Sequence, residues 1–213
     1  MAKICAPGKP RILCLHGFRT SAAILETQIR KWPESILEKL DLVFLDARYP
    51  SAGKSSVEGI FDPPYYEWFQ FQVHQDHTEY QNYEECIAYI EDFMVQNGPF
   101  DGLLGFSQEE GVALTKVPKI KFVIIISGAK AGGAKYTAPK LAANAFAAPI
   151  KCPSLHFIGE QDFQKTEGLA LIDSFVDPLV IHHPKAHTVP RLDDQSVKIA
   201  QNFVEKILNL ATT

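Results

Sequence analysis

The stretch GLLGFSQ, residues 102–108, decides the fold predicted for this chain. It opens with a short apolar run that predicts a buried strand, and Ser107 stands two residues after Gly105. A Gly-x-Ser sequence directly after a strand is typical of a sharp turn toward a helix that exposes the serine hydroxyl. Ser107 is therefore a candidate nucleophile, and the alternative for the same residue is a helix N-cap.

Five further apolar runs resemble this one and alternate with longer amphipathic stretches. Several are apolar throughout, as expected where helices cover both faces of a sheet. The alternation predicts a single α/β domain over residues 1–213, with a mainly parallel, doubly wound sheet of about six strands flanked by helices. The predicted strands are residues 11–15, 41–45, 102–105, 121–127, 154–159 and 179–183.

Helices are predicted outside these strands. Residues 20–39 form a helical region that Pro33 divides, because proline interrupts a helix. Residues 79–96 carry apolar side chains mostly at three- and four-residue steps, and the following Asn97-Gly98 predicts a left-handed stop. Residues 196–210 form the closing helix, and a short helix is predicted at 140–146.

Two more residues stand where an activated serine needs them. Asp162 follows the strand 154–159 by three residues, and His187 follows the strand 179–183 by four. A serine becomes a strong nucleophile when a histidine takes its proton and a carboxylate fixes the tautomer of that histidine. The chain order Ser, Asp, His is that of the α/β-hydrolase fold. The ordinary alternatives are a helix cap for Asp162 and a solvated loop side chain for His187.

The first strand runs into His16-Gly17-Phe18, where this fold supplies one N–H of an oxyanion hole. We expect the backbone N–H groups of Phe18 and Gln108 to be the two donors. His16 itself is predicted to orient the loop.

An insertion at residues 49–78 separates the second strand from the long helix. A loop of this length in a compact domain is usually functional. Its dense aromatic residues predict either a plug at the edge of the core or a lid or wall for an apolar or aromatic substrate. The candidate substrate-binding residues are Tyr65, Tyr66, Trp68 and Phe69.

Composition excludes several other classes. The net charge is −4 without a cluster of Lys or Arg, so nucleic acid is not an expected partner. The four cysteines are scattered, and the neighbours His182 and His183 would point to opposite faces of a strand, so no metal site is expected. No apolar run approaches the roughly 18 residues of a membrane span, and no signal peptide is evident, so a cytoplasmic location is expected. An oligomeric state cannot be inferred.

Four segments, residues 13–21, 59–71, 99–108 and 182–192, resemble the FSH family of serine hydrolases. The amino-acid sequences of residues 67–71 and 117–121 are most similar to those of the plant members of the family. The resemblance implies a small cytosolic α/β-hydrolase that acts as a carboxylesterase or thioesterase. By the same likeness Ser107 is the nucleophile, Asp162 the acid and His187 the base, and no cofactor is needed.

The chain departs from the family pattern directly after Gln108. The family has glycine and small residues there, followed by a long helix, whereas this chain has Glu109 and Glu110. Residues 108–120 leave room for roughly two helical turns, too few to cover the sheet. Three explanations fit: a segment missing from the sequence, a naturally shortened form, or a variant that the family tolerates.

The expected function is hydrolysis of a small apolar or aromatic ester through an acyl-enzyme. The carboxylates of Glu109 and Glu110 beside an oxyanion hole would lower the activity, because that hole must stabilise negative charge. The alternative is therefore a ligand-binding protein of the same fold with impaired catalysis.

Overall fold

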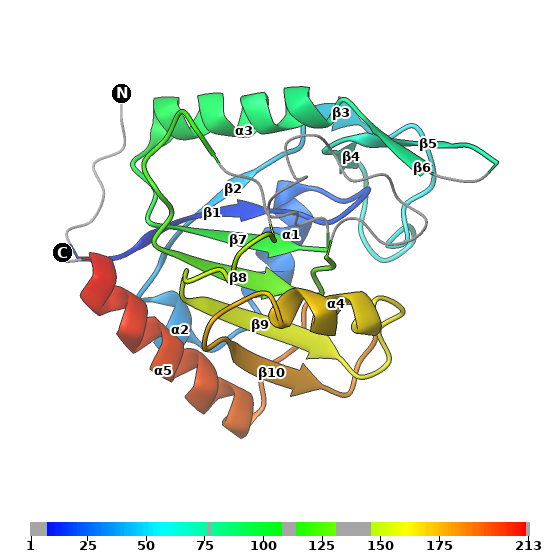
Figure 1. The fold of residues 1–213 in the computed structure, drawn as a ribbon. Helices are drawn as coiled ribbons and strands as arrows, with labels where there is room; N and C mark the ends of the chain where they lie inside the picture. Colours follow the sequence, from blue (N-terminus) through cyan, green and yellow to red (C-terminus); the bar gives the residue numbers. More distant parts are fainter. Residues whose placement is uncertain (1–7, 76–77, 108–113, 131–145, 212–213) are drawn as a thin grey trace.

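The structure is a computed structural model that describes residues 8–75, 78–107, 114–130 and 146–211. Parallel strands form its central sheet in the order β10-β9-β8-β7-β1-β2 (Figure 1). The six predicted strands are confirmed, each within one residue at either end. They are β1 (Arg11–Leu15), β2 (Asp41–Leu45), β7 (Gly102–Phe106), β8 (Phe122–Ile126), β9 (Ser154–Gly159) and β10 (Leu179–His183).

Helices lie on both faces of this sheet, as the apolar strands require. On one face the sheet packs against α1, α2 and α5, and on the other against α3 and α4 (Figure 1). This is the predicted doubly wound α/β architecture. The helices are α1 (Ala22–Ile29), α2 (Glu34–Leu37), α3 (Tyr83–Asn97), α4 (Lys165–Ile172) and α5 (Asp194–Ala211).

Side chains of β1 alternate between two separate hydrophobic cores, as the two-residue period of a strand dictates. Ile12 and Cys14 belong to the core beneath α1 and α5, whereas Leu13 belongs to the core beneath α3. The sheet is therefore the buried middle layer. Its carboxyl edge, where the loops after β1, β7, β9 and β10 emerge, is where open α/β sheets build their sites.

The insertion contains two small antiparallel pairs rather than an irregular loop. The strands β3 (Tyr49–Pro50) and β4 (Tyr66–Glu67) form one pair, and β5 (Gln70–Val73) and β6 (Thr78–Gln81) form the other. The helix predicted from residue 79 therefore begins only at Tyr83, because residues 78–81 pair with β5. The insertion ends at Gln81 instead of at residue 78.

The stop of α3 also differs from the prediction. Gly98 is extended, with φ −77° and ψ −171°, so it is not a left-handed cap. Its N–H still donates to the carbonyl oxygen of Met94 at 2.8 Å. A Cβ atom at Gly98 would lie 2.5 Å from that oxygen. Glycine is therefore required by the close backbone approach and not by a positive φ.

The connection from β7 to β8 is short, as predicted. Residues 108–113 lie outside the described part, and residues 114–121 contain no helix. The predicted helix at 140–146 lies outside the described residues except for Phe146, which is in a turn. A cavity of about 520 Å³ lies on the face of the sheet that α3 and α4 cover. It is lined by Leu103 and Val123 of the sheet, Ile87 and Ile90 of α3, and Leu171 of α4.

Candidate active site

Ser107 directly follows β7 and has φ +70°. A positive φ is strained for a residue with a side chain and persists only where the surroundings hold it. Here the N–H of Ser107 donates to the carbonyl oxygen of Ile126 at 3.0 Å, which fixes the turn to the end of β8. This strained turn after a strand is the local geometry of a nucleophile elbow.

His187 reaches Ser107 from the loop after β10. Its Nε2 atom lies 2.8 Å from the Ser107 Oγ atom. Its ring contacts two aromatic rings, with centroid distances of 5.1 Å to Phe106 and 4.8 Å to Phe163. These contacts restrict the imidazole to an orientation that points one nitrogen at the serine hydroxyl.

Asp162, from the loop after β9, holds the other nitrogen of this ring. The Nδ1 atom of His187 lies 2.9 Å from Oδ1 and 3.0 Å from Oδ2 of Asp162. Because a carboxylate only accepts hydrogen bonds, Nδ1 carries the proton and Nε2 is free to accept one from Ser107. The structure thus brings together the three residues that the sequence singled out.

The Asp162 carboxyl group is favoured in its charged form. Burial alone would raise its pKa, but the N–H of Gln164 at 2.9 Å, the nearby Ser127 and His187 together hold the pKa of Asp162 below its usual value. The side chain is 3% exposed. A buried carboxylate that stays charged can stabilise a protonated His187.

The loop after β1 lies against the turn that carries Ser107. A Cβ atom at Gly17 would come within 2.7 Å of the Phe106 ring and 3.5 Å of the Phe106 carbonyl oxygen. Among the described residues, none accepts a hydrogen bond from the N–H of Phe18. Gln108, the other predicted donor, lies outside the described residues.

His16 has a structural place in this loop, as predicted. Its Nε2 atom accepts a hydrogen bond from the N–H of Ala47 at 3.0 Å, and its Nδ1 atom lies 2.8 Å from the carbonyl oxygen of Gly17. Burial lowers the pKa of His16 to about 4. The neutral ring thus donates from Nδ1 and links the loop after β1 to the loop after β2.

The four aromatic residues predicted to bind substrate occupy different positions. Trp68 and Phe69 are buried and line the cavity, and the Trp68 indole N–H donates to the carbonyl oxygen of His16 at 2.7 Å. The Tyr65 hydroxyl donates to the Phe61 carbonyl oxygen at 2.5 Å, and Tyr66 pairs with Pro50. These hydrogen bonds and strand pairs hold the insertion together and attach it to the loop after β1. Substrate binding by these four residues stays a prediction.

Sequence reasoning did not single out Phe163. Its side chain is 77% exposed although its ring packs on His187. The only signal in the sequence is its position directly after Asp162. An exposed aromatic ring beside the reacting atoms is suited to contact an apolar substrate.

Within the described residues, no group of three or more His, Cys, Asp or Glu side chains could hold a metal ion. His182 is exposed and lies 2.8 Å from Glu160, whereas His183 is buried. The predicted orientation of these neighbours to opposite faces is therefore confirmed.

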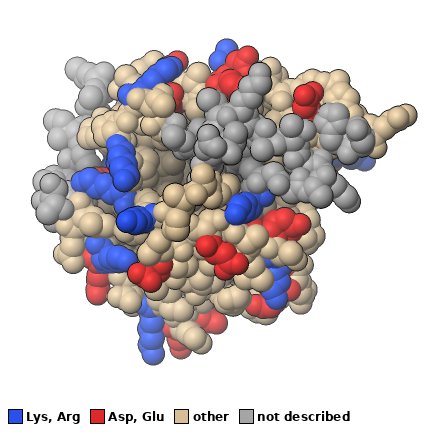
Figure 2. All heavy atoms as spheres, in the orientation of Figure 1, with Lys and Arg blue, Asp and Glu red and all other residues tan. Residues whose placement is uncertain are grey.

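Figure 2 shows basic and acidic side chains on the same visible face, so the net charge is not gathered there in one acidic patch.

In the ranges 8–75, 78–107, 114–130 and 146–211, no helix combines the length and the apolar character needed to cross a membrane.

Esterases are among the relatives of this chain. Esterase C25G4.2 of Caenorhabditis elegans is 28% identical over 219 residues, which cover 93% of this chain and 95% of the relative. Esterase OVCA2 of Bos taurus is 26% identical over 207 residues, covering 84% and 89%. Rhodanese-like domain-containing protein 6 of Arabidopsis thaliana is also 26% identical, over 85% of this chain and 36% of its own length. The predicted closer similarity to plant members is not confirmed.

Solved structures share the fold. Esterase PE8 superposes with a TM-score of 0.58 at 19% identity, covering 97% of this chain and 96% of that one. Acyl-protein thioesterase 2 of Zea mays superposes with a TM-score of 0.57 at 16% identity, covering 95% and 97%. The fold is therefore that of the α/β-hydrolase esterases.

The profile described as serine hydrolase (FSH1) matches residues 6–199, which is most of the chain. Together with the esterase relatives, this match identifies the protein as a hydrolase of the esterase type. The chain belongs to the FSH1 family of serine hydrolases.

Proposed function

We propose that this esterase cleaves a small apolar or aromatic ester or thioester through an acyl-enzyme on Ser107. The observation that carries the proposal is the continuous contact from the Ser107 Oγ atom to His187 at 2.8 Å and from His187 to Asp162 at 2.9 Å. Three side chains from three separate loops in this arrangement have the geometry of nucleophile, base and orienting carboxylate.

The reaction begins when Ser107 Oγ attacks the substrate carbonyl carbon and its proton moves to Nε2 of His187. The carbonyl oxygen becomes an oxyanion, for which the N–H groups of Phe18 and Gln108 are the proposed donors. When this intermediate collapses, the bond to the leaving alcohol or thiol breaks, and that group takes the proton from His187. An acyl-enzyme on Ser107 remains.

Water completes the cycle by the same route. His187 takes a proton from the water, whose oxygen attacks the acyl carbon, and the bond to Ser107 Oγ breaks as the proton returns to the serine. The product is a carboxylic acid. These reaction steps need no cofactor, because Ser107, His187 and Asp162 provide the nucleophile, the base and the carboxylate.

An apolar or aromatic substrate is supported by the surroundings of Ser107. The exposed Phe163 ring lies beside His187, where it would be buried by an apolar group of the substrate. Burial of an apolar surface on binding is favourable at roughly 25 cal/mol per Å². We propose a cytoplasmic enzyme acting on small molecules, as expected from the sequence.

The test is a fluorophosphonate, which forms a stable adduct with an activated serine. We expect an increase in intact mass of one adduct per chain, mapped by peptide analysis to Ser107. Ser107→Ala should abolish both the adduct and the hydrolysis of activated aryl esters. Undiminished turnover by Ser107→Ala would refute the proposal. Ligand binding by the wild type with neither adduct nor turnover would favour the alternative of a non-catalytic binding protein.

A further inference from the structure

Arg19 adopts a strained backbone conformation directly after Phe18. Its φ is +54°, in the left-handed region that residues with a Cβ atom rarely occupy. Such a conformation persists when neighbouring groups hold it in place. Here the Arg19 carbonyl oxygen accepts a hydrogen bond from the Ser55 hydroxyl at 2.6 Å. The backbone next to the Phe18 N–H is therefore held from the insertion.

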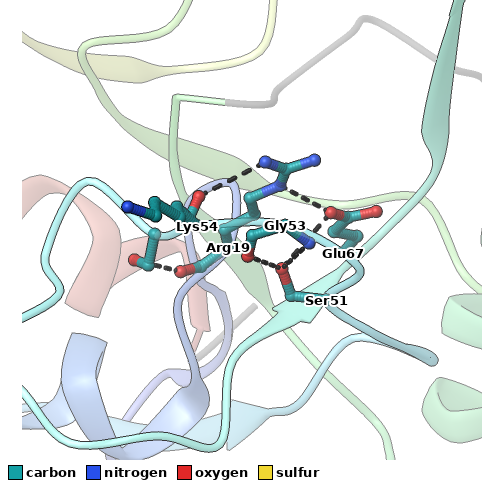
Figure 3. A network of polar contacts seen from close by, with 6 residues as sticks. Arg19, Ser51, Gly53, Lys54 and Glu67 are labelled. Atoms are coloured by element: carbon teal, nitrogen blue, oxygen red, sulfur yellow. Dashed lines mark hydrogen bonds and ion pairs between the residues drawn. The ribbon is translucent and has the colours of Figure 1, made fainter.

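The side chain of Arg19 is held from the insertion as well. Its Nε atom donates to the Oε1 atom of Glu67 at 2.7 Å, and Figure 3 shows the guanidinium facing this carboxylate. Glu67 lies in β4, and its side chain is 3% exposed, whereas that of Arg19 is 30% exposed. A charge-assisted bond to a buried carboxylate is strong, and removing one partner leaves the other charge without compensation.

Further contacts surround the same guanidinium. Nη1 of Arg19 donates to the carbonyl oxygen of Lys54 at 3.3 Å, and the Ser51 hydroxyl lies 3.4 Å from Glu67 Oε1 (Figure 3). The Arg19 Cζ atom lies 4.7 Å from the centroid of the Phe18 ring. The Arg19 side chain thus connects Lys54 and β4 to the residue whose N–H is proposed to bind the oxyanion.

Gly53 provides the space for this arrangement. A Cβ atom at Gly53 would overlap the guanidinium of Arg19. The atoms that it would meet are at the end of a long flexible side chain, which can move without disturbing the core. Gly53→Ala would therefore displace the guanidinium while both Arg19 and Glu67 remain in the chain.

We propose that Arg19 and Glu67 are positioning residues, which hold the loop after β1 so that the Phe18 N–H faces the oxyanion formed at Ser107. The inference rests on the proposed function. Neither side chain has to touch the reacting atoms. The insertion, through Glu67, acts on the transition state rather than on substrate affinity.

The test compares Glu67→Gln and Gly53→Ala with the wild type on an activated aryl ester. Removing a whole oxyanion donor costs roughly 10²- to 10³-fold in kcat. Misplacing one donor should therefore lower kcat by at least about tenfold, with KM nearly unchanged. A trifluoromethyl ketone, whose adduct carries an oxyanion, should bind more weakly by the same factor as kcat/KM, while binding of the carboxylate product stays constant.

Glu26→Gln is the matched control, because it makes the same change in an exposed pair, Arg30 with Glu26 on α1. It should keep the kcat of the wild type. Thermal unfolding shows whether each variant is folded, and Gly53→Ala decides if Glu67→Gln does not fold. A folded Gly53→Ala with wild-type kcat, or with a raised KM alone, would overturn the inference.

The outcome also separates this inference from the proposed function. If the wild type forms no fluorophosphonate adduct at Ser107, the proposed function fails and takes the inference with it. If turnover depends on Ser107 but does not change in either variant, the inference alone fails.

Discussion

The Nε2 atom of His187 lies 2.8 Å from the Oγ atom of Ser107, although 80 residues separate them in the chain. The contact exists because β7 and β10 are parallel strands of one sheet, so both loops emerge at the same edge. Asp162 completes the arrangement from the loop after β9. The positions of the three side chains therefore follow from the topology of the sheet.

The first prediction concerns the charge of Asp162. Asp162→Asn keeps the size of the side chain but allows the amide to donate to Nδ1, which favours the wrong tautomer of His187. We expect kcat to fall by roughly 10⁴-fold, as for the same change in serine proteases. Steady-state hydrolysis of an activated ester measures it. Retention of wild-type kcat by Asp162→Asn would show that the carboxylate does not orient the base.

The sequence was sufficient for the strands and for the order of the site residues. A short, continuously apolar run such as residues 122–126 predicts a buried strand. Ser107, Asp162 and His187 each follow such a run within a few residues. That the three side chains gather at one place could then be predicted from the common edge of a parallel sheet.

The insertion could not be predicted in the same way. Its role depends on contacts between residues far apart in the chain, such as the bond from Trp68 to His16, 52 residues apart, and that from Arg19 to Glu67, 48 residues apart. Residues 78–81 show no clear periodicity of apolar side chains. Their pairing with β5 decides their conformation, so α3 begins after them and not at the predicted residue.

The second prediction is acid sensitivity of folding caused by buried histidines. Burial lowers the pKa of His156 in the folded state to about 4, from 6.5. As the pH falls below 6.5, the unfolded chain binds this proton while the folded chain does not, so stability is lost progressively until about pH 4. His16 acts in the same direction.

Urea unfolding between pH 7 and pH 4.5 measures this effect. The free energy of unfolding of the wild type should fall with pH, and each buried histidine contributes up to about 1.4 kcal/mol per pH unit. His156→Gln should make that slope shallower. An unchanged slope in this variant would mean that His156 is protonated without cost in the folded protein.

The third prediction tests Phe163 as a substrate contact. Because its side chain is 77% exposed, Phe163→Ala should leave the melting temperature nearly unchanged. Loss of its apolar surface should raise KM for aryl-acyl esters several-fold and change the hydrolysis of acetate esters little. Leu169→Ala in α4, also at an exposed apolar position, is the control and should keep the KM of the wild type. Equal effects of both variants would argue against a specific contact with Phe163.

The fourth prediction uses neighbouring residues of β7 to test the asymmetry of the two cores. Leu103 lines the cavity of about 520 Å³, whereas Leu104 is fully buried in the core beneath α1 and α5. A larger side chain can enter a cavity, but in a close-packed core it forces neighbours apart at a cost of about 1–3 kcal/mol. Leu104→Phe should therefore destabilise the protein by that amount.

Leu103→Phe should instead be neutral or stabilise folding, because its ring gains apolar contacts in the cavity at about 0.8 kcal/mol per buried methylene equivalent. Denaturant unfolding of the two variants provides the comparison, with the same substitution on the same strand. If both variants lose stability equally, the face between α3 and α4 is as closely packed as the other. If only Leu104→Phe loses stability, the cavity over the sheet is real space at Leu103, four residues before the nucleophile in the chain.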